Sequence, residues 1–194
     1  DQDIPMEGPI LAVGDSFVFG DMVSNHETWP AYLQKITGHP VANGGVFGYG
    51  LDQTVLRAEY LFPELKPSHV LAGFIPSDIK RTRYRVRTGV NRPYFLVEDG
   101  ALTLHNTPVP PSRPKKEDLG WFRNLFGYSF FVDWCMKHAG LYPWWNLGRW
   151  SNETAHSQHV QVSQLLMKRL DGMSKEKGVP VTVVVQYNAK HIMG

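Results

Sequence analysis

The chain has 194 residues, 42% of them hydrophobic and 20% charged, which is typical of a globular protein and unlike a disordered or coiled-coil chain. Its 20 Lys and Arg residues nearly balance its 18 Asp and Glu residues, and a net charge of +2 is too small for a general nucleic-acid or membrane-surface binder. The single Cys135 excludes an intramolecular disulfide and a multi-thiolate zinc site. No apolar run approaches the roughly 18 to 20 residues of a transmembrane helix.

Short apolar runs alternate with segments of helical spacing along the chain. The first helix is predicted to begin after the N-cap Thr28 and to end at Gly38, with Tyr32, Leu33 and Ile36 as its apolar stripe. The second is predicted over 52–62, closed by Pro63. Strands are predicted at 10–13, 41–42, 69–75 and 180–185, the last of them buried.

The last helix is predicted over 153–177, with a stripe of Val162, Leu166, Leu170 and Met173. Strands that alternate with helices in this way predict an α/β fold with a parallel sheet covered by helices. We expect one domain over 1–194 that carries an insertion.

About seventy residues between the third and fourth strands, 84–151, do not fit this alternation and predict the insertion. It starts with a hairpin, because Glu98-Asp99-Gly100 separates two strand-like runs. Its later part is dense in aromatic residues up to Trp150. These residues either form a small core of the insertion, which is the default for clustered aromatics, or Trp144, Trp145 and Trp150 form a lid or platform over a binding site.

Three of the predicted strands end in polar turns, and these turns hold the candidate chemistry. In an open parallel sheet, ligands bind beyond the carboxyl ends of the strands, so the turns are expected to meet at one edge. The turns are Asp15-Ser16, Asn43-Gly44-Gly45 and Ser77-Asp78. Ser16 can act as a nucleophile if a base is near, and a glycine N–H in the second turn can approach an oxyanion closely.

The three turns resemble the sequence blocks of the SGNH/GDSL hydrolases. The resemblance rests on Gly14-Asp15-Ser16-Phe17 with Phe19-Gly20, on the glycine-rich run 43–50, and on 73–78, which occur in the family's order. It covers the chain outside the insertion. The resemblance implies a three-layer α/β/α sandwich with a flavodoxin-like sheet, and ester hydrolysis through an acyl-serine intermediate.

The resemblance also implies a role for each matching residue. Ser16 corresponds to the nucleophile, and its N–H and that of Gly45 correspond to oxyanion donors. The third donor of the family is an Asn side chain, but Ser77 stands at that position. A hydroxyl donates one hydrogen bond only, and loss of one such donor costs on the order of 10² to 10³ in rate. Supporting roles fall to Asp15, Asn43 and Asp78, which are expected to fix the turns.

The Asp-x-x-His block that carries the family's catalytic His is absent from the printed sequence. We therefore expect that this chain lacks a C-terminal strand and that block, with His191 as a weaker substitute for the base. The other histidines show no ligand-like spacing with carboxylates, so no metal is expected, and no cofactor either.

The run 80–87 alternates Arg with other residues, which on a strand places four arginines on one face. The default is a solvated strand face. The sharper alternative is a contact between Arg81 or Arg83 and an anionic or polysaccharide substrate, and nucleic acid ranks third.

The expected activity is hydrolysis of O-acetyl or other small acyl esters of a carbohydrate. One alternative is an O-acyltransferase that uses the same serine, and another is a catalytically silent carbohydrate-binding domain. The expected partner is therefore a small-molecule or carbohydrate ester, without nucleic acid, and a periplasmic or secreted setting is favoured over the cytoplasm. Cys135 alone does not decide that setting.

Overall fold

The computed structural model describes residues 8–87, 90–111, 120–141, 145, 149–151 and 153–187. The chain divides into two compact units. The first comprises 1–82, 97–102 and 159–194, and the second comprises 83–96 and 103–158. None of the helices described has the length and apolarity that crossing a bilayer requires.

The first unit contains a four-stranded sheet in the order β2-β1-β3-β9. The strands are β1 (Ile10–Gly14), β2 (Val41–Asn43), β3 (His69–Phe74) and β9 (Val181–Val185), and each neighbouring pair is parallel. Parallel neighbours need crossover connections, which the intervening helices supply. The predicted fold class, a parallel α/β sheet covered by helices, is confirmed.

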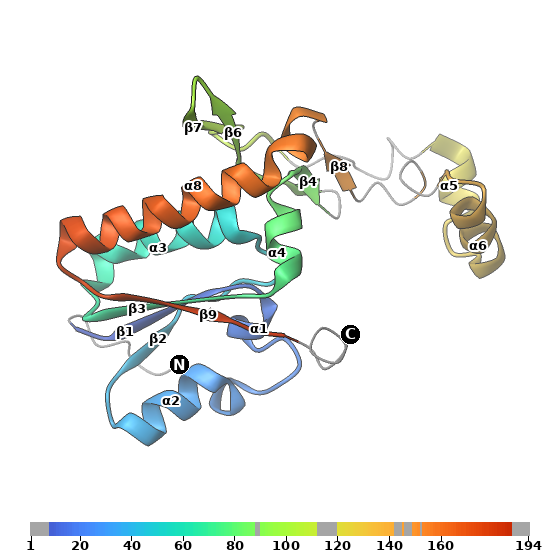
Figure 1. Cartoon of the computed structure of the whole chain (residues 1–194). Coiled ribbons are helices and arrows are strands. Elements are labelled where there is room, and N and C mark those ends of the chain that lie inside the picture. Colours follow the sequence, from blue (N-terminus) through green and yellow to red (C-terminus); the bar gives the residue numbers. More distant parts are fainter. Residues whose placement is uncertain are drawn as a thin grey trace. The chain divides into compact units, whose positions relative to one another are not determined.

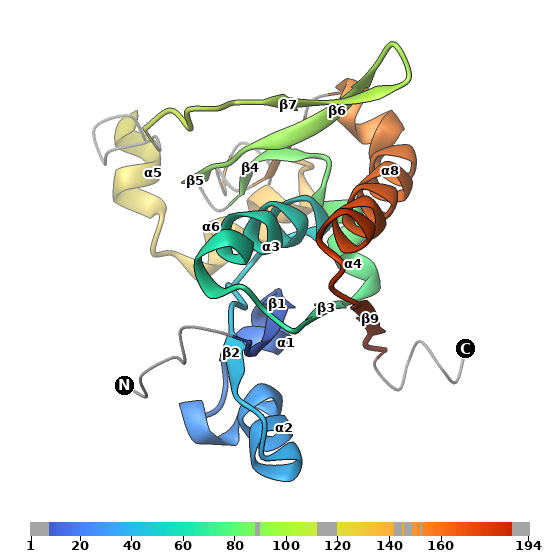
Figure 2. The ribbon, with the colours of Figure 1, turned by 90° about the vertical axis from the view of Figure 1, so that its left-hand side faces the viewer.

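Helices cover both faces of this sheet. They are α1 (Ser16–Phe19), α2 (Trp29–Thr37), α3 (Leu51–Leu65), α4 (Pro76–Arg81) and α8 (Glu153–Lys177), with a short 3-10 helix at Asn25–Glu27. Figures 1 and 2 both show α3 and α8 over one face and α2 beneath the other. The layers are therefore helix, sheet and helix.

The core lies between the sheet and α3 and α8. Leu11, Val13 and Val70 of the strands are fully buried, as is Val55 of α3. The predicted stripe of α8 is confirmed, because Val162, Leu166, Leu170 and Met173 are all buried.

Two predicted helices differ from the structure. The second continues past Pro63 to Leu65, because a proline in the last turn removes only one intrahelical donor, and it ends at Lys66 in the left-handed conformation. The first begins after Thr28 and ends at Gly38 as predicted, but Tyr32 and Ile36 of its stripe are exposed. Its neighbour β2 has three residues, which leaves little sheet surface for that stripe to cover.

The prediction of a buried fourth strand was wrong. β9 pairs with β3 on one side only and is an edge of the described sheet, so Val183 and Val185 are exposed. The β-branched run indicated a strand correctly, but strand propensity does not distinguish an edge from a centre.

The prediction of one alternating strand over 80–87 was also wrong. Pro76 and Asp78 start a helix, so Arg81 is the last residue of α4 and only Tyr84–Arg87 forms a strand, β4. Asp78 and Arg81 are three residues apart and form an ion pair that a strand would separate.

The second unit contains a small antiparallel sheet in which β4 pairs with β5 (Val90–Asn91) and β8 (Arg149–Ser151). The predicted hairpin is confirmed as β6 (Tyr94–Glu98) and β7 (Ala101–His105), with positive φ at Asp99 and Gly100 as a tight Asp-Gly turn requires. Helices α5 (Gly120–Phe126) and α6 (Phe130–His138) follow. The exact limits of the insertion stay a prediction.

Candidate active site

The turns after β1 and β2 lie side by side, as the sheet order requires. The parallel ladder continues beyond β2, because the N–H of Gly44 donates to the Ala12 carbonyl at 2.7 Å and that of Val46 donates to the Gly14 carbonyl at 3.0 Å. On the other side Gly14 pairs with Gly73 of β3. The carboxyl ends of β2, β1 and β3 therefore meet at one edge.

The first turn holds Ser16 at the start of α1. Asp15 is fully buried and caps this helix, its Oδ1 accepting the N–H of Phe17 at 3.0 Å. The turn closes at Gly20, where φ is +87°. Ser16 itself is half-buried, and in the described part of the chain neither its hydroxyl nor its N–H has a hydrogen-bond partner. Both groups are therefore open to a ligand.

The second turn is held against α1 by Asn43. Its Nδ2 donates to the Val18 carbonyl at 3.0 Å, and its Oδ1 accepts the N–H of Gly45, also at 3.0 Å. A Cβ at Gly45 would lie 2.4 Å from the Phe19 nitrogen, so only glycine permits this approach. The N–H that was expected to bind an oxyanion is thus occupied by Asn43 in this conformation.

The third turn holds Ser77 in the first turn of α4. Asp78 is buried, and its Oδ2 accepts the N–H of Ile75 at 2.9 Å, which fixes the start of the helix. Ser77 is half-buried, and its hydroxyl has no hydrogen-bond partner among the residues described. This hydroxyl is therefore available to a ligand.

The two candidate arginines have different surroundings. Arg81 is held by Asp15, Asp78 and the Tyr49 carbonyl. Arg83 belongs to the second unit, where its Nη2 donates to the Tyr84 hydroxyl at 2.8 Å. All three of these contacts are made by Nη1 of Arg81.

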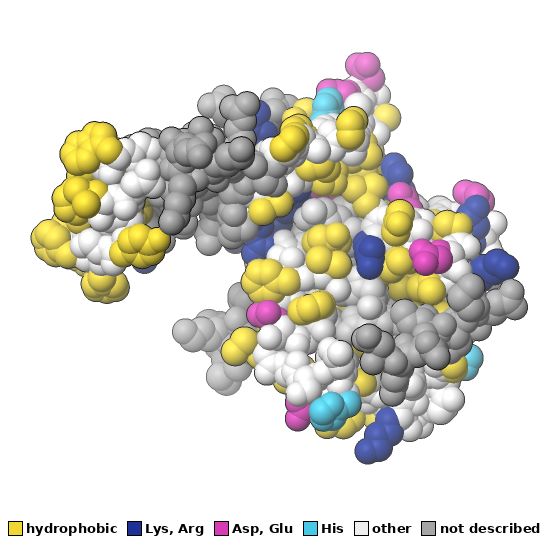
Figure 3. Space-filling model, turned by 180° about the vertical axis from the view of Figure 1, so that it is seen from behind, with side chains coloured by type: hydrophobic (Ala, Val, Ile, Leu, Met, Phe, Trp, Pro, Cys, Tyr) yellow, Lys and Arg dark blue, Asp and Glu magenta, His cyan; other side chains and the backbone are white. Residues whose placement is uncertain are grey.

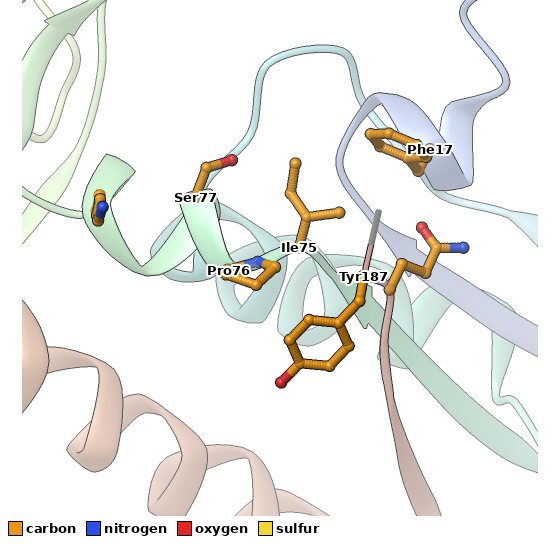
Figure 4. A pocket seen from close by; sticks show the side chains of 7 residues that line it. Phe17, Ile75, Pro76, Ser77 and Tyr187 are labelled. Carbon is orange, nitrogen blue, oxygen red and sulfur yellow. The ribbon is translucent and has the colours of Figure 1, made fainter. Parts of the chain in front are cut away.

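A pocket of about 190 Å³ lies at the third turn. Figure 4 shows its labelled wall, with Ile75, Pro76 and Ser77 at the junction of β3 and α4, Phe17 on α1, and Tyr187 after β9. Lys80 and Gln186 complete the lining. The wall is mainly apolar, with a few polar groups that converge on it, as is usual in small-molecule sites.

Sequence reasoning missed the contributions of Phe17, Lys80, Gln186 and Tyr187. The signal for the last two was present, because β9 ends at the same sheet edge and the N–H of Gln186 donates to the Phe74 carbonyl. Applying the strand-end rule to the fourth strand would have found them. Phe17 and Lys80 are neighbours of predicted residues along α1 and α4.

Other candidate residues lie elsewhere. Trp145 is buried in the second unit, where its Nε1 donates to Asp133 at 2.9 Å, and Trp144 and His191 are outside the described residues.

Two of the described histidines contact side chains away from the candidate site. His39 contacts Ser68, and His69 contacts Thr182. His69 begins β3, at the opposite end of the strand from Ser77. Among the side chains described, no cluster of three potential metal ligands occurs.

No protein-family model matches the chain, and no curated protein matches it. Among solved structures it is similar to a protein described as lipolytic and of the G-D-S-L family, from Desulfitobacterium hafniense DCB-2. The identity is 16% and the TM-score 0.35, over 92% of this chain and 77% of that chain. It is also similar to a GDSL-like lipase from Bacteroides thetaiotaomicron VPI-5482, with 15% identity and a TM-score of 0.31, over 92% and 68% of the two chains. At these values neither similarity assigns an activity to this chain.

Proposed function

We propose that this chain is a serine-dependent ester hydrolase of the SGNH/GDSL type. The observation that carries the proposal is the state of Ser16, whose hydroxyl and N–H are both open at the sheet edge where the other two turns converge. A serine that merely capped a helix would use its side chain for the cap, but Asp15 performs that role here. The Ser16 hydroxyl is therefore available to act as a nucleophile.

In the proposed reaction the Ser16 hydroxyl attacks the ester carbonyl and gives up its proton to a base. The negative oxygen of the tetrahedral intermediate receives hydrogen bonds from the Ser16 N–H and the Ser77 hydroxyl. The alcohol leaves with a proton from the base, and water then releases the acid from the acyl-serine. The Gly45 N–H joins these donors when it turns away from Asn43, at the cost of its present hydrogen bond.

The proposal needs a general base, and no described histidine is hydrogen-bonded to Ser16. We place the base after β9, because that strand ends at the sheet edge that holds Ser77. His191 follows β9 in the printed sequence. His191→Ala tests His191 as the base, and a wild-type rate of ester hydrolysis in this variant would exclude it.

The pocket supports a small acyl group as the substrate's acid part. Its volume of about 190 Å³ and the apolar wall of Phe17, Ile75 and Tyr187 fit an acetyl or other short acyl chain. Lys80 and Gln186 offer hydrogen bonds to hydroxyl groups, which supports a carbohydrate as the alcohol part. O-acetylated sugars are therefore the proposed substrate class.

A second candidate, a catalytically silent binding domain for such esters, is favoured by one observation. Its oxyanion site would be weak, because the Gly45 N–H is occupied and Ser77 replaces an amide. Both candidates use the same pocket, so only a measurement of turnover separates them.

The test is steady-state hydrolysis of p-nitrophenyl acetate, butyrate and octanoate and of an acetylated xylose, by the full-length protein. We expect the acetyl esters to react fastest, and Ser16→Ala to lower kcat by about 10³-fold or more. Ser163→Ala on α8 is the matched control and should leave the rates unchanged, since its hydroxyl only bonds the His159 carbonyl. Hydrolysis that persists in Ser16→Ala would overturn the hydrolase, and binding of the sugar without turnover would favour the silent domain.

A further inference from the structure

Arg81 connects all three turns of the candidate site through one nitrogen. Its Nη1 donates to Asp15 Oδ2 at 3.2 Å, to the Tyr49 carbonyl at 2.9 Å, and to Asp78 Oδ1. Asp15 lies in the first turn, Tyr49 follows the second, and Asp78 lies in the third. These segments are distant in the sequence, so this single guanidinium links them directly.

The two carboxylates that Arg81 bridges also hold the backbone of the serine turns. The second oxygen of Asp15 caps the N–H of Phe17, next to Ser16, and the second oxygen of Asp78 caps the N–H of Ile75, two residues before Ser77. Both carboxylate side chains are 1% exposed and Arg81 is 16% exposed. Buried carboxylates require such a partner, because an unpaired buried charge is strongly unfavourable.

The chain makes room for Arg81 at Gly50. A Cβ at that position would lie 2.9 Å from the Arg81 Cβ and 2.8 Å from Asp52 Oδ1. Gly50 has an ordinary negative φ, so a close approach and not an unusual backbone explains the glycine. The glycine-rich second turn therefore serves two contacts, with α1 at Gly45 and with Arg81 at Gly50.

We propose that Arg81 is a positioning residue for ester hydrolysis, which sets the separation of the Ser16 and Ser77 hydroxyls without touching the substrate. This proposal rests on the proposed function. It is an alternative to the expectation that Arg81 contacts an anionic substrate, and it is supported by the three protein acceptors that engage its Nη1. A displacement of about 1 Å between reacting groups costs on the order of 10² in rate, so the link affects kcat more than KM.

The test compares Arg81→Met and Arg81→Lys with wild type in the full-length protein. A fluorophosphonate titration counts the reactive sites, and kcat is expressed per titrated site. We expect Arg81→Met to lower kcat per site by about 10- to 100-fold with KM within about 2-fold. Arg81→Lys keeps the charge on a shorter side chain, so it should fold and recover part of the rate.

Two controls separate positioning from a purely structural role. Arg169→Met removes an arginine that pairs with Glu59 at 2.6 Å between α8 and α3, and it should leave kcat and KM unchanged. The double variant Asp78→Asn/Arg81→Met should lose less rate than the product of the two single losses, because the Arg81–Asp78 contact is shared by both changes.

The outcomes that overturn the role are distinct from those that overturn the function. If Arg81→Met or Arg81→Lys lowers only the number of titrated sites, with kcat per site unchanged, Arg81 is structural and the proposal is wrong. Losses that add in the double variant contradict it as well. A wild-type protein that neither reacts with fluorophosphonate nor hydrolyses esters overturns the proposed function and this role with it.

Discussion

The turns at the sheet edge and the helical hairpin α5–α6 both carry strong sequence signals. The two regions differ in how deeply their side chains are buried. At the sheet edge, Asp15, Gly45 and Asp78 are buried and each is fixed by contacts that few other residues could make. In the hairpin, Phe130 and Phe131 are 84% and 69% exposed. A dense run of aromatic residues therefore predicts burial less reliably than a short motif whose backbone can adopt only one conformation.

Trp145 anchors the hairpin. Trp145 is buried, donates to Asp133, and meets Phe122 edge to face with ring centroids 6.1 Å apart. Figure 3 shows hydrophobic side chains on the surface of this part of the chain. The further exposed residues are Trp121, Leu125, Tyr128 and Trp134. Most of the large apolar side chains of this hairpin are exposed, whereas Asp15 and Asp78, which fix two of the sheet-edge turns, are buried.

The sharpest test of this contrast is Gly45→Ala. The added Cβ would lie 2.4 Å from the Phe19 nitrogen and 2.7 Å from the Val18 carbonyl carbon, and these backbone atoms cannot give way as a flexible side chain can. We expect kcat/KM for p-nitrophenyl acetate to fall by about 10²-fold or more, because α1 and Ser16 are displaced. Gly172→Ala in α8 is the matched control: its Cβ meets open space, so stability should rise by about 0.5–1 kcal/mol. Equal activities would show that the close approach is not required.

The core between the sheet and α8 should be sensitive to truncation. Leu166 on α8 is fully buried, and Leu166→Ala is expected to lower the free energy of unfolding by about 2–5 kcal/mol. Urea unfolding followed by far-UV circular dichroism measures the change. A loss below about 1 kcal/mol would mean that α8 does not pack on the sheet as described.

Within the hairpin, the Trp145–Asp133 contact should stabilise α6 by about the free energy of one hydrogen bond. Trp145→Phe keeps the buried ring but removes the donor to Asp133, so α6 should lose about 1 kcal/mol of local stability. Hydrogen exchange of the α6 amides is the measurement. Trp134→Phe, at a half-exposed ring, is the comparison and should change protection little. If both variants behave alike, Trp145 is not an anchor.

The smallest effect on the free energy of unfolding is expected at the exposed rings of the helical hairpin α5–α6. Phe130→Ser should change the free energy of unfolding by no more than about 0.5 kcal/mol, because that side chain is 84% exposed. Phe95→Ala, at a ring that is 1% exposed, should cost about 3–5 kcal/mol by comparison. A loss above about 1 kcal/mol for Phe130→Ser would show that the hairpin buries this ring and would remove the contrast.

Much of the fold could be predicted because local signals agree with it. Thr28 and Gly38 cap α2 as expected, and the stripe of α8 is buried at every predicted position. The errors arose where the burial or the end of an element depends on a neighbouring element or residue. The exposed face of β9 depends on which strand lies beside it, and the end of α3 depends on where the helix's last turn falls relative to Pro63.

The meeting of the three turns at one sheet edge could be predicted from the sequence, whereas the roles of their residues stay predictions. The strand-end rule predicted that the turns with Ser16, Gly45 and Ser77 share one edge, and the continued ladder places the first two side by side. The Arg81 link was not visible, because an alternating charge pattern favoured a strand until Asp78 was known to start a helix. The occupation of the Gly45 N–H by Asn43 depends on a side-chain rotamer that no sequence pattern specifies.

The central claim is that Ser16 is the nucleophile of the site. The most direct measurement treats the full-length protein with a fluorophosphonate and locates the modified residue by peptide mass spectrometry. One adduct per chain on Ser16, absent from Ser16→Ala and present in Ser163→Ala, is the predicted result. An adduct on another residue, or an unmodified Ser16 in an ester-hydrolysing protein, would contradict the account.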